Sequence, residues 1–145
     1  MPSQRAIFRS TGMDKIEIEP YERAGNIKFG SERETVRKDN GNFKEFRKSR
    51  FSKNSTDDFS SFHVFYSEDD RVEAVEFFRE SNLYFHDIQL FSQSYGDLKT
   101  RLNALDSNIT EDESGIIYKT LGFSVYSPDG EQVESILVFE KGYYD

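Results

Sequence analysis

The sequence predicts an α+β fold built from two tandem repeats of a helix followed by an antiparallel β-meander, with the helices packed on one side of the sheet. Two observations lead to this prediction. Three short blocks recur in the same order about 60 residues apart, and each copy combines a helix-start signal with strands joined by turns. The chain has 145 residues, and its 14 Phe and 8 Tyr supply enough apolar area for one core.

The internal repeat is the most informative feature of the sequence. Its blocks match at offsets of 60 or 61 residues. The matching pairs are 27–31 with 88–92, 66–70 with 126–130, and 72–78 with 133–139. Blocks that keep both order and spacing indicate a duplicated supersecondary unit. We therefore predict a disordered leader over 1–13, a first repeat over 14–82 and a second repeat over 83–145, integrated in one domain.

Each repeat contains one predicted helix. Ser31 and Glu34 fit a capping box, in which each side chain bonds the other residue's free backbone N–H. With Gly41 as the stop, this predicts a helix over 32–40. The second helix is predicted to follow Ser92 or Ser94. Its apolar residues at helical spacing, which predict one buried stripe, are Tyr95, Leu98, Leu102 and Leu105.

Strands and turns are predicted after each helix. Ser-Pro-Asp-Gly at 127–130 favours a tight turn between strands 121–126 and 133–139. The acidic triplet at 68–70 is predicted to join strands 62–66 and 72–78 in the same way. Two segments rich in Ser, Asn, Thr and acids are predicted to be loops, namely 53–61 and 107–114.

Alternation along the strands assigns a predicted core face and an outer face. The predicted core positions are Leu121, Phe123 and Val125, with Ser61, His63 and Phe65 as their counterparts in the first repeat. Tyr66 and Tyr126 then occupy equivalent places on the outer face, where a repeated sheet can present them to a partner.

The chain resembles a known fold group over residues 24–37. These residues read AGNIKFGSERETVR, close to a G-x-I-x-F-G motif that opens small bacterial helix-plus-meander units. The motif is similar to that of the fold group of β-lactamase inhibitor protein and the outer-membrane assembly lipoproteins. The resemblance implies a tandem helix-plus-meander architecture and a protein-binding scaffold, often inhibitory. Because the chain has no Cys, it lacks the disulfides and the lipobox of those proteins, and no functional residue is transferred.

Composition and charge indicate the cellular location of the protein and the class of partner it binds. No run of residues is apolar enough to span a membrane and no secretory signal opens the sequence, so we expect a bacterial cytoplasmic protein without a membrane partner. The net charge of −8 disfavours general nucleic-acid binding. The first 50 residues nevertheless carry a net +4 and the rest −12.

The basic segment 44–53 has two interpretations. Its Lys and Arg residues alternate with aromatic residues, which is typical of proteins that bind single-stranded nucleic acid. The same pattern fits an exposed strand whose cations prevent edge-to-edge pairing, and we favour that interpretation.

Few residues point to catalysis. The two histidines are His63 and His86, and His86-Asp87 is the only adjacent pair of a histidine and a carboxylate. Neighbours on a strand face opposite ways, which disfavours this pair as a general base. The acidic clusters at 68–70 and 111–113 lack the spacing of a calcium loop. We expect no cofactor and no metal, and keep a small enzyme or ligand-binding protein using His63 or His86 as an alternative.

These observations favour a non-enzymatic protein-binding module, such as an intracellular inhibitor or immunity-type protein of a basic partner. Acidic surfaces attract basic partners and raise their association rates. The contact residues we predict are Tyr66, Glu68, Asp69, Glu73, Tyr126, Glu134, Tyr143 and Tyr144. The sequence alone does not define the partner or the oligomeric state.

Overall fold

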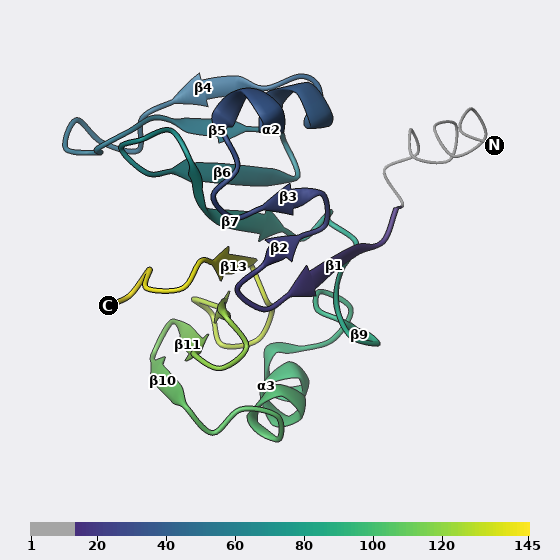
Figure 1. The fold of residues 1–145 in the computed structure, drawn as a ribbon. Helices are drawn as coiled ribbons and strands as arrows, with labels where there is room; N and C mark the ends of the chain where they lie inside the picture. Colours follow the sequence, from purple (N-terminus) through teal and green to yellow (C-terminus); the bar gives the residue numbers. More distant parts are fainter. Residues whose placement is uncertain (1–13) are drawn as a thin grey trace.

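The computed structural model describes residues 14–145 and has an α+β architecture with two helices and two sheets (Figure 1). The predicted leader over 1–13 lies outside the described residues. Neither described helix has the length and apolar composition that a membrane crossing requires.

The first part of the chain contains seven strands and one helix. In order they are β1 (Ile16–Glu19), β2 (Arg23–Ala24), β3 (Ile27–Lys28), α2 (Arg33–Asn40), β4 (Lys44–Phe46), β5 (Thr56–Asp58), β6 (Phe62–Tyr66) and β7 (Val72–Phe78). The second part contains β8 (Leu83–Phe85), β9 (Ile88–Gln89), α3 (Tyr95–Asn103), β10 (Ile109–Asp112), β11 (Gly115–Tyr118), β12 (Phe123–Tyr126) and β13 (Ser135–Phe139).

Strands from both parts of the chain share each sheet. The larger sheet has the order β10-β11-β12-β13-β7-β6-β5-β4 and is antiparallel throughout. Its centre is the β13–β7 pair, in which Val138 lies opposite Val75. The smaller sheet has the order β3-β2-β1-β8-β9, and its β1–β8 pair is parallel. The two parts of the chain are therefore joined in both sheets.

One large apolar core connects the helices to the sheets. Val36 of α2 and Leu98 and Leu102 of α3 belong to the same cluster of buried side chains as Val75 and Val138 of the larger sheet. The burial of Leu98 and Leu102 confirms the stripe predicted for the second helix. Leu105 is half exposed, because α3 ends at Asn103 and the stripe ends with it.

The helix starts agree with the prediction in one case and differ in the other. Ser94 caps α3, since its side chain accepts a hydrogen bond from the backbone N–H of Asp97 at 3.1 Å. The N-cap of α2 is Glu32, which makes no side-chain capping bond, so the predicted box between Ser31 and Glu34 is wrong. Gly41 ends α2 with φ 82°, as its lack of a side chain allows.

Both predicted hairpins are confirmed, but both predicted loops contain strands. β6 pairs with β7, and β12 pairs with β13. The segment 53–61 contains β5, and 107–114 contains β10. Polar composition suggested loops here. β5 can be a strand because its polar residues have hydrogen-bond partners within the fold. β10 can be a strand because it lies at the edge of the larger sheet, where its polar side chains are exposed to water.

The faces predicted for the second part of the chain are correct, whereas those for the first part are wrong. Phe123 and Val125 lie in the large core. In β6, however, Val64 and Tyr66 face that core, while Phe65 packs on the opposite face in a second, smaller cluster with Phe139. The strand register aligns Val64 with Val75, Val138 and Phe123, one residue away from the alignment that the sequence suggested.

Candidate functional site

A hollow in the surface brings together four of the predicted contact residues. It has a volume of about 410 Å³ and lies at the turn between β6 and β7. Its lining residues are Lys53, Tyr66, Ser67, Glu68, Asp69 and Glu73. We call it the acidic hollow, because three carboxylates face one ammonium group there.

A smaller hollow of about 210 Å³ adjoins it and shares three lining residues, Lys53, Tyr66 and Glu73. Tyr143 lines this second hollow, so five of the eight predicted contact residues lie in the two hollows. The ring of Tyr143 stacks on Phe139 with 5.8 Å between ring centroids. The C-terminal segment therefore packs over the outer face of the sheet.

The remaining predicted contact residues do not line the acidic hollow. Tyr126 and Tyr144 are exposed on the outside of the protein. The backbone N–H of Glu134 donates to the carbonyl of Tyr126 at 2.8 Å, which places both at the β12–β13 turn. Tyr66 is only 4% exposed, so the expectation that Tyr66 and Tyr126 form one presented surface is wrong. Tyr66 points inward because β6 turns its even-numbered residues to the core.

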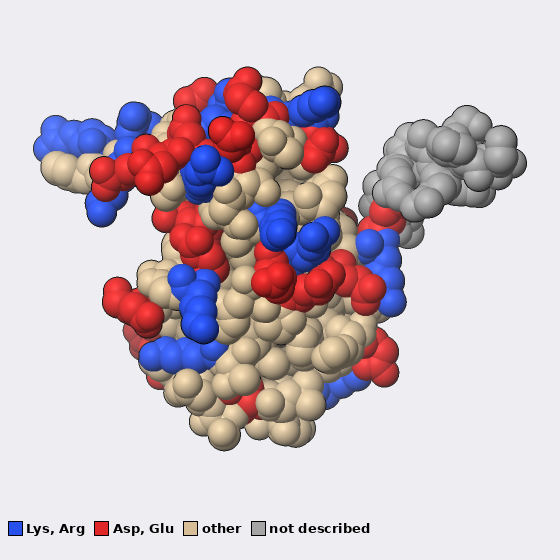
Figure 2. Space-filling model, viewed as in Figure 1, with Lys and Arg blue, Asp and Glu red and all other residues tan. Residues whose placement is uncertain are grey.

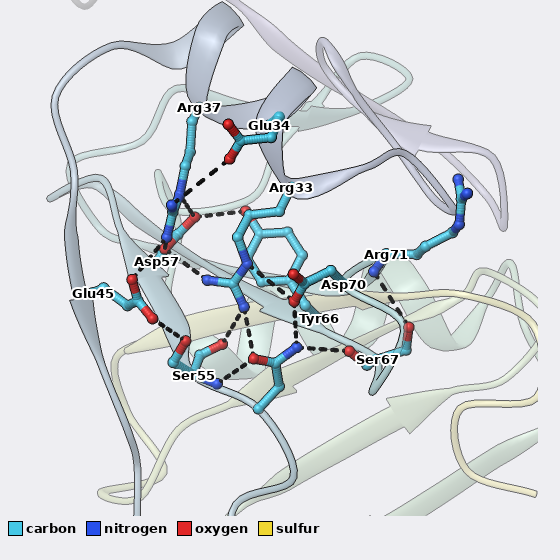
Figure 3. A network of polar contacts seen from close by, with 11 residues as sticks. Arg33, Glu34, Arg37, Glu45, Ser55, Asp57, Tyr66, Ser67, Asp70 and Arg71 are labelled. Carbon is cyan, nitrogen blue, oxygen red and sulfur yellow. Dashed lines mark hydrogen bonds and ion pairs between the residues drawn. The ribbon is translucent and has the colours of Figure 1, made fainter.

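Behind the acidic hollow lies a buried network of ion pairs centred on Asp57 of β5 (Figure 3). Asp57 is fully buried and accepts four hydrogen bonds. Two of them come as a fork from Arg37, at 2.8 and 2.7 Å. The others come from Arg33 at 3.1 Å and from the hydroxyl of Tyr66 at 2.9 Å. Both carboxylate oxygens are thus saturated.

The two arginines of the network lie one turn apart on α2, which places them on the same helix face. The guanidinium of Arg33 stacks on the ring of Tyr66 at 4.0 Å from its centroid, and that of Arg37 stacks on Phe43 at 4.1 Å. Each cation is held both by Asp57 and by an aromatic face. This arrangement fixes the position of Tyr66 from behind.

Polar residues at the rim connect the network to the hollow. Arg33 donates to the side chain of Asn54 at 2.9 Å, and Asn54 donates in turn to Asp70 at 2.6 Å and to the carbonyl of Ser67 at 2.8 Å. These bonds tie the turn that carries Glu68 to α2 (Figure 3). Among the described residues, no buried side-chain polar atom is left without a partner.

Charge and burial shift the pKa values of the network. Burial, together with the hydrogen bond to Asp57, raises the pKa of Tyr66 far above its usual value. The hydrogen bond to Asp57 raises the pKa of Arg37. The hydrogen bond from Asn54 lowers the pKa of Asp70. The raised pKa values keep Tyr66 protonated and Arg37 charged at neutral pH, which suits a structural role better than proton transfer.

In contrast to Asp70, two carboxylates at or beside the acidic hollow, Glu73 and Glu140, have raised pKa values. Burial raises the pKa of Glu73, and nearby Lys53 only partly offsets this. Burial, followed by the charge of Glu73, raises the pKa of Glu140. The backbone N–H of Glu140 donates to the carbonyl of Glu73 at 2.9 Å, so these two residues are neighbours. Glu140 lines neither hollow, but its charge lies beside Glu73 and is only partly compensated there.

This raised pKa predicts how stability depends on pH. Because folded Glu73 binds its proton more tightly than the unfolded chain does, it stabilises the fold at low pH, and this contribution is lost as pH rises from about 4 through its folded pKa. Glu73→Gln is therefore expected to raise the free energy of unfolding at pH 7, by less than about 1 kcal/mol because water screens the site. The gain should vanish below about pH 4.

Urea unfolding of both proteins at pH 3.5 and pH 7 measures this difference. Glu80→Gln is the matched control, because Glu80 is exposed and makes no ion pair within the described residues. A gain of the same size for Glu80→Gln, or one that persists at pH 3.5, would contradict the assignment to Glu73.

The histidines lie outside both hollows. His63 of β6 lies opposite Asp58 of β5, and its Nε2 is 3.4 Å from Oδ1 of Asp58. Sequence reasoning missed this pair, because only the strand register brings the two residues together. His86 occupies the β8–β9 turn with φ 54°. Within residues 14–145, no three His, Asp or Glu side chains are arranged to hold a metal ion.

The ion network itself was also missed. The available signal was a pair of arginines four residues apart on a predicted helix, with an acid-rich segment nearby. Comparison with protein-family models, with curated proteins and with solved structures finds no match to this chain. The site is therefore interpreted from its own geometry.

Proposed function

We propose that this chain is a non-enzymatic protein-binding module whose acidic hollow receives a basic side chain of a partner protein, as in an inhibitor or immunity-type protein. The main observation in its favour is that Tyr66, Glu68, Asp69 and Glu73 line one hollow. The hollow is concave and carries polar groups around an aromatic wall, which are properties of a recognition site.

The negative charge of the acidic hollow favours a positively charged group of the partner as its ligand. Among residues 14–145, Lys53 is the only cation that lines the acidic hollow, and its ammonium group lies 3.5 Å from Glu68. Both side chains are mostly exposed, so this ion pair contributes little and a partner can displace it. A partner's Lys or Arg would also relieve the repulsion between Glu73 and Glu140, which raises the affinity for a positive group.

The rigidity of the residues around the acidic hollow also supports its role as a binding site. Tyr66 is held by Asp57 at its hydroxyl and by Arg33 on its ring. The turn with Glu68 and Asp69 is tied to α2 through Asn54. A preorganised site loses little conformational freedom when a partner binds, which favours affinity.

The architecture we propose for this scaffold is a tandem duplication with both helices on one side of the larger sheet, in keeping with the resemblance to the β-lactamase inhibitor protein fold group. Equivalent contacts in the two parts support it. Isolated bridges join Glu32 to Arg71 and Ser94 to Gln132. An ion pair links each helix to an outermost strand, and these pairs are Arg37–Glu45 at 3.1 Å and Lys99–Glu111 at 2.6 Å.

Charge reversal in the hollow tests the function. Glu68→Lys with Asp69→Lys is expected to weaken partner binding at least tenfold, because two exposed attractive charges become repulsive. The tagged protein is used to capture partners from its native lysate, and the captured partner is purified and titrated against each variant by calorimetry. Both residues are exposed, so the variant should fold normally.

The control is Glu80→Lys with Glu113→Lys, which makes the same change in net charge at exposed residues outside both hollows. The control should bind as the unchanged protein does. Equal loss in both variants would mean that only net charge matters, and equal binding in all three would mean that the acidic hollow is not the site.

A further inference from the structure

The connection between β4 and β5 carries an unusual surface. We call residues 44–53 the basic tip. Its first residues form β4, and the part that follows β4 extends beyond the larger sheet in Figure 1; Figure 2 shows Lys and Arg gathered with uncharged atoms on the same projection. The segment contains five cations and one acid. Its net charge of +4 lies on a protein whose total charge is −8.

The cations of the basic tip are largely unpaired. Within the described residues, the ammonium group of Lys53 reaches Glu68, whereas Lys44, Arg47, Lys48 and Arg50 form no ion pair with a carboxylate. In an acidic protein, cations usually find carboxylate partners at the surface. Four that do not are available to an external anion.

Exposed aromatic rings accompany these cations. Of the six large apolar side chains exposed among residues 14–145, three are Phe43, Phe46 and Phe51. Phe51 is 80% exposed, the highest value of the six. The guanidinium of Arg50 lies over its ring, 5.0 Å from the centroid. A flat, exposed ring beside a guanidinium group provides a stacking platform for another flat group.

Local hydrogen bonds give the basic tip a defined shape. Arg47 donates to the carbonyl of Ser52 at 2.7 Å. The backbone N–H of Phe51 donates to the hydroxyl of Ser49 at 3.1 Å, and the N–H of Ser49 donates to the hydroxyl of Ser52 at 3.1 Å. The exposed ring of Phe51 is thus held outward by its own turn rather than by the core.

We propose that the basic tip binds single-stranded nucleic acid, with Arg47, Lys48 and Arg50 contacting phosphates and Phe51 stacking on a base. This activity goes beyond the proposed protein-binding function, and its surface adjoins the two hollows, because Lys48 lines the smaller hollow and Lys53 lines both. A single strand is favoured over a duplex, because paired bases do not offer their faces to a ring. The acidic remainder of the protein repels phosphates, so contact is confined to the tip and involves about three phosphates.

Fluorescence anisotropy with 5′-labelled dT12 tests the proposal. The unchanged protein is expected to bind dT12 more tightly than a 12-base-pair duplex. Three phosphate contacts predict a log–log salt slope of about −2, which is a loss of about 20-fold between 50 and 200 mM NaCl. Phe51→Ala is expected to weaken binding about tenfold with an unchanged salt slope, since it removes stacking alone.

A charge variant and its control distinguish phosphate contacts made by the basic tip from the effect of the protein's net charge. Arg47→Gln with Arg50→Gln should reduce the salt slope by about 1.4 and weaken binding. Lys38→Gln with Lys141→Gln removes two exposed cations elsewhere and should leave the salt slope unchanged and weaken binding only slightly. The proposal is overturned if dT12 does not bind at 50 mM NaCl, if Phe51→Ala binds as tightly as the unchanged protein, or if an oligoglutamate peptide of equal charge binds as well as dT12.

The two proposals can fail separately. Glu68→Lys with Asp69→Lys adds positive charge near the basic tip, so it should retain or strengthen dT12 binding while it abolishes capture of a basic partner. Loss of one activity without the other would therefore identify which surface was assigned wrongly.

Discussion

Replacing Asp57 with asparagine is expected to lower the free energy of unfolding by about 3–5 kcal/mol. The change keeps the size of the side chain but removes the charge that neutralises two arginines. Arg33 is 6% exposed and would remain as a buried cation without its fully buried counter-ion. Asparagine also replaces one of the two acceptor oxygens with an NH2 donor, so two of the four buried hydrogen bonds to Asp57 would be lost or opposed by a donor.

Urea unfolding followed by circular dichroism measures this loss at pH 7. Asp87→Asn is the matched control, because Asp87 is exposed in the β8–β9 turn and should change stability by less than about 0.5 kcal/mol. If the two variants are equally stable, the network does not stabilise the fold. If Asp57→Asn is destabilised as expected, the wall of the acidic hollow depends on this one carboxylate.

Replacing Leu102 with alanine is expected to cost about 2–5 kcal/mol, because it opens a cavity in the large core. Leu102 is fully buried in α3 and belongs to the cluster that joins the helix to the larger sheet. Leu105, three residues later, is 51% exposed. The identical change at Leu105 should cost less than about 1 kcal/mol, although both residues fit the same helical stripe.

Thermal and urea unfolding of the two variants give this comparison directly. Each change removes the same atoms from the same kind of side chain, so the difference isolates burial. Similar losses would mean that α3 continues past Asn103 in solution and that Leu105 packs with Leu102.

Local signals in the sequence predicted those parts of the fold that depend on neighbouring residues. The Ser94 cap, the stop at Gly41 and the tight turn at 127–130 each depend on residues within one turn, and each is present in the structure. The capping box at Ser31 failed because Arg33 and Arg37 place α2 against Asp57, and the helix begins one residue later. Tertiary contacts can therefore override a local signal.

The buried side of the site could not be predicted in this way. Asp57 stands among Ser, Thr and Asp residues that resemble a loop, and only its contacts with α2 explain a buried strand there. The pair of His63 and Asp58 depends on the register of two strands. Glu68 and Asp69 could be placed at a turn from the sequence, because exposed turn residues need no distant partner.

The position of β13 has a consequence for how this chain tolerates loss of its last residues. β13 is the last strand in residues 14–145, yet it lies at the centre of the larger sheet between β12 and β7. During synthesis, β7 and β12 are made before β13, so their edges stay unpaired until β13 is available. The larger sheet is therefore completed only when synthesis has passed Phe139. Proteolytic trimming or a premature stop codon before Ser135 would remove β13 and leave one three-stranded piece (β10-β11-β12) and one four-stranded piece (β7-β6-β5-β4) with facing unpaired edges.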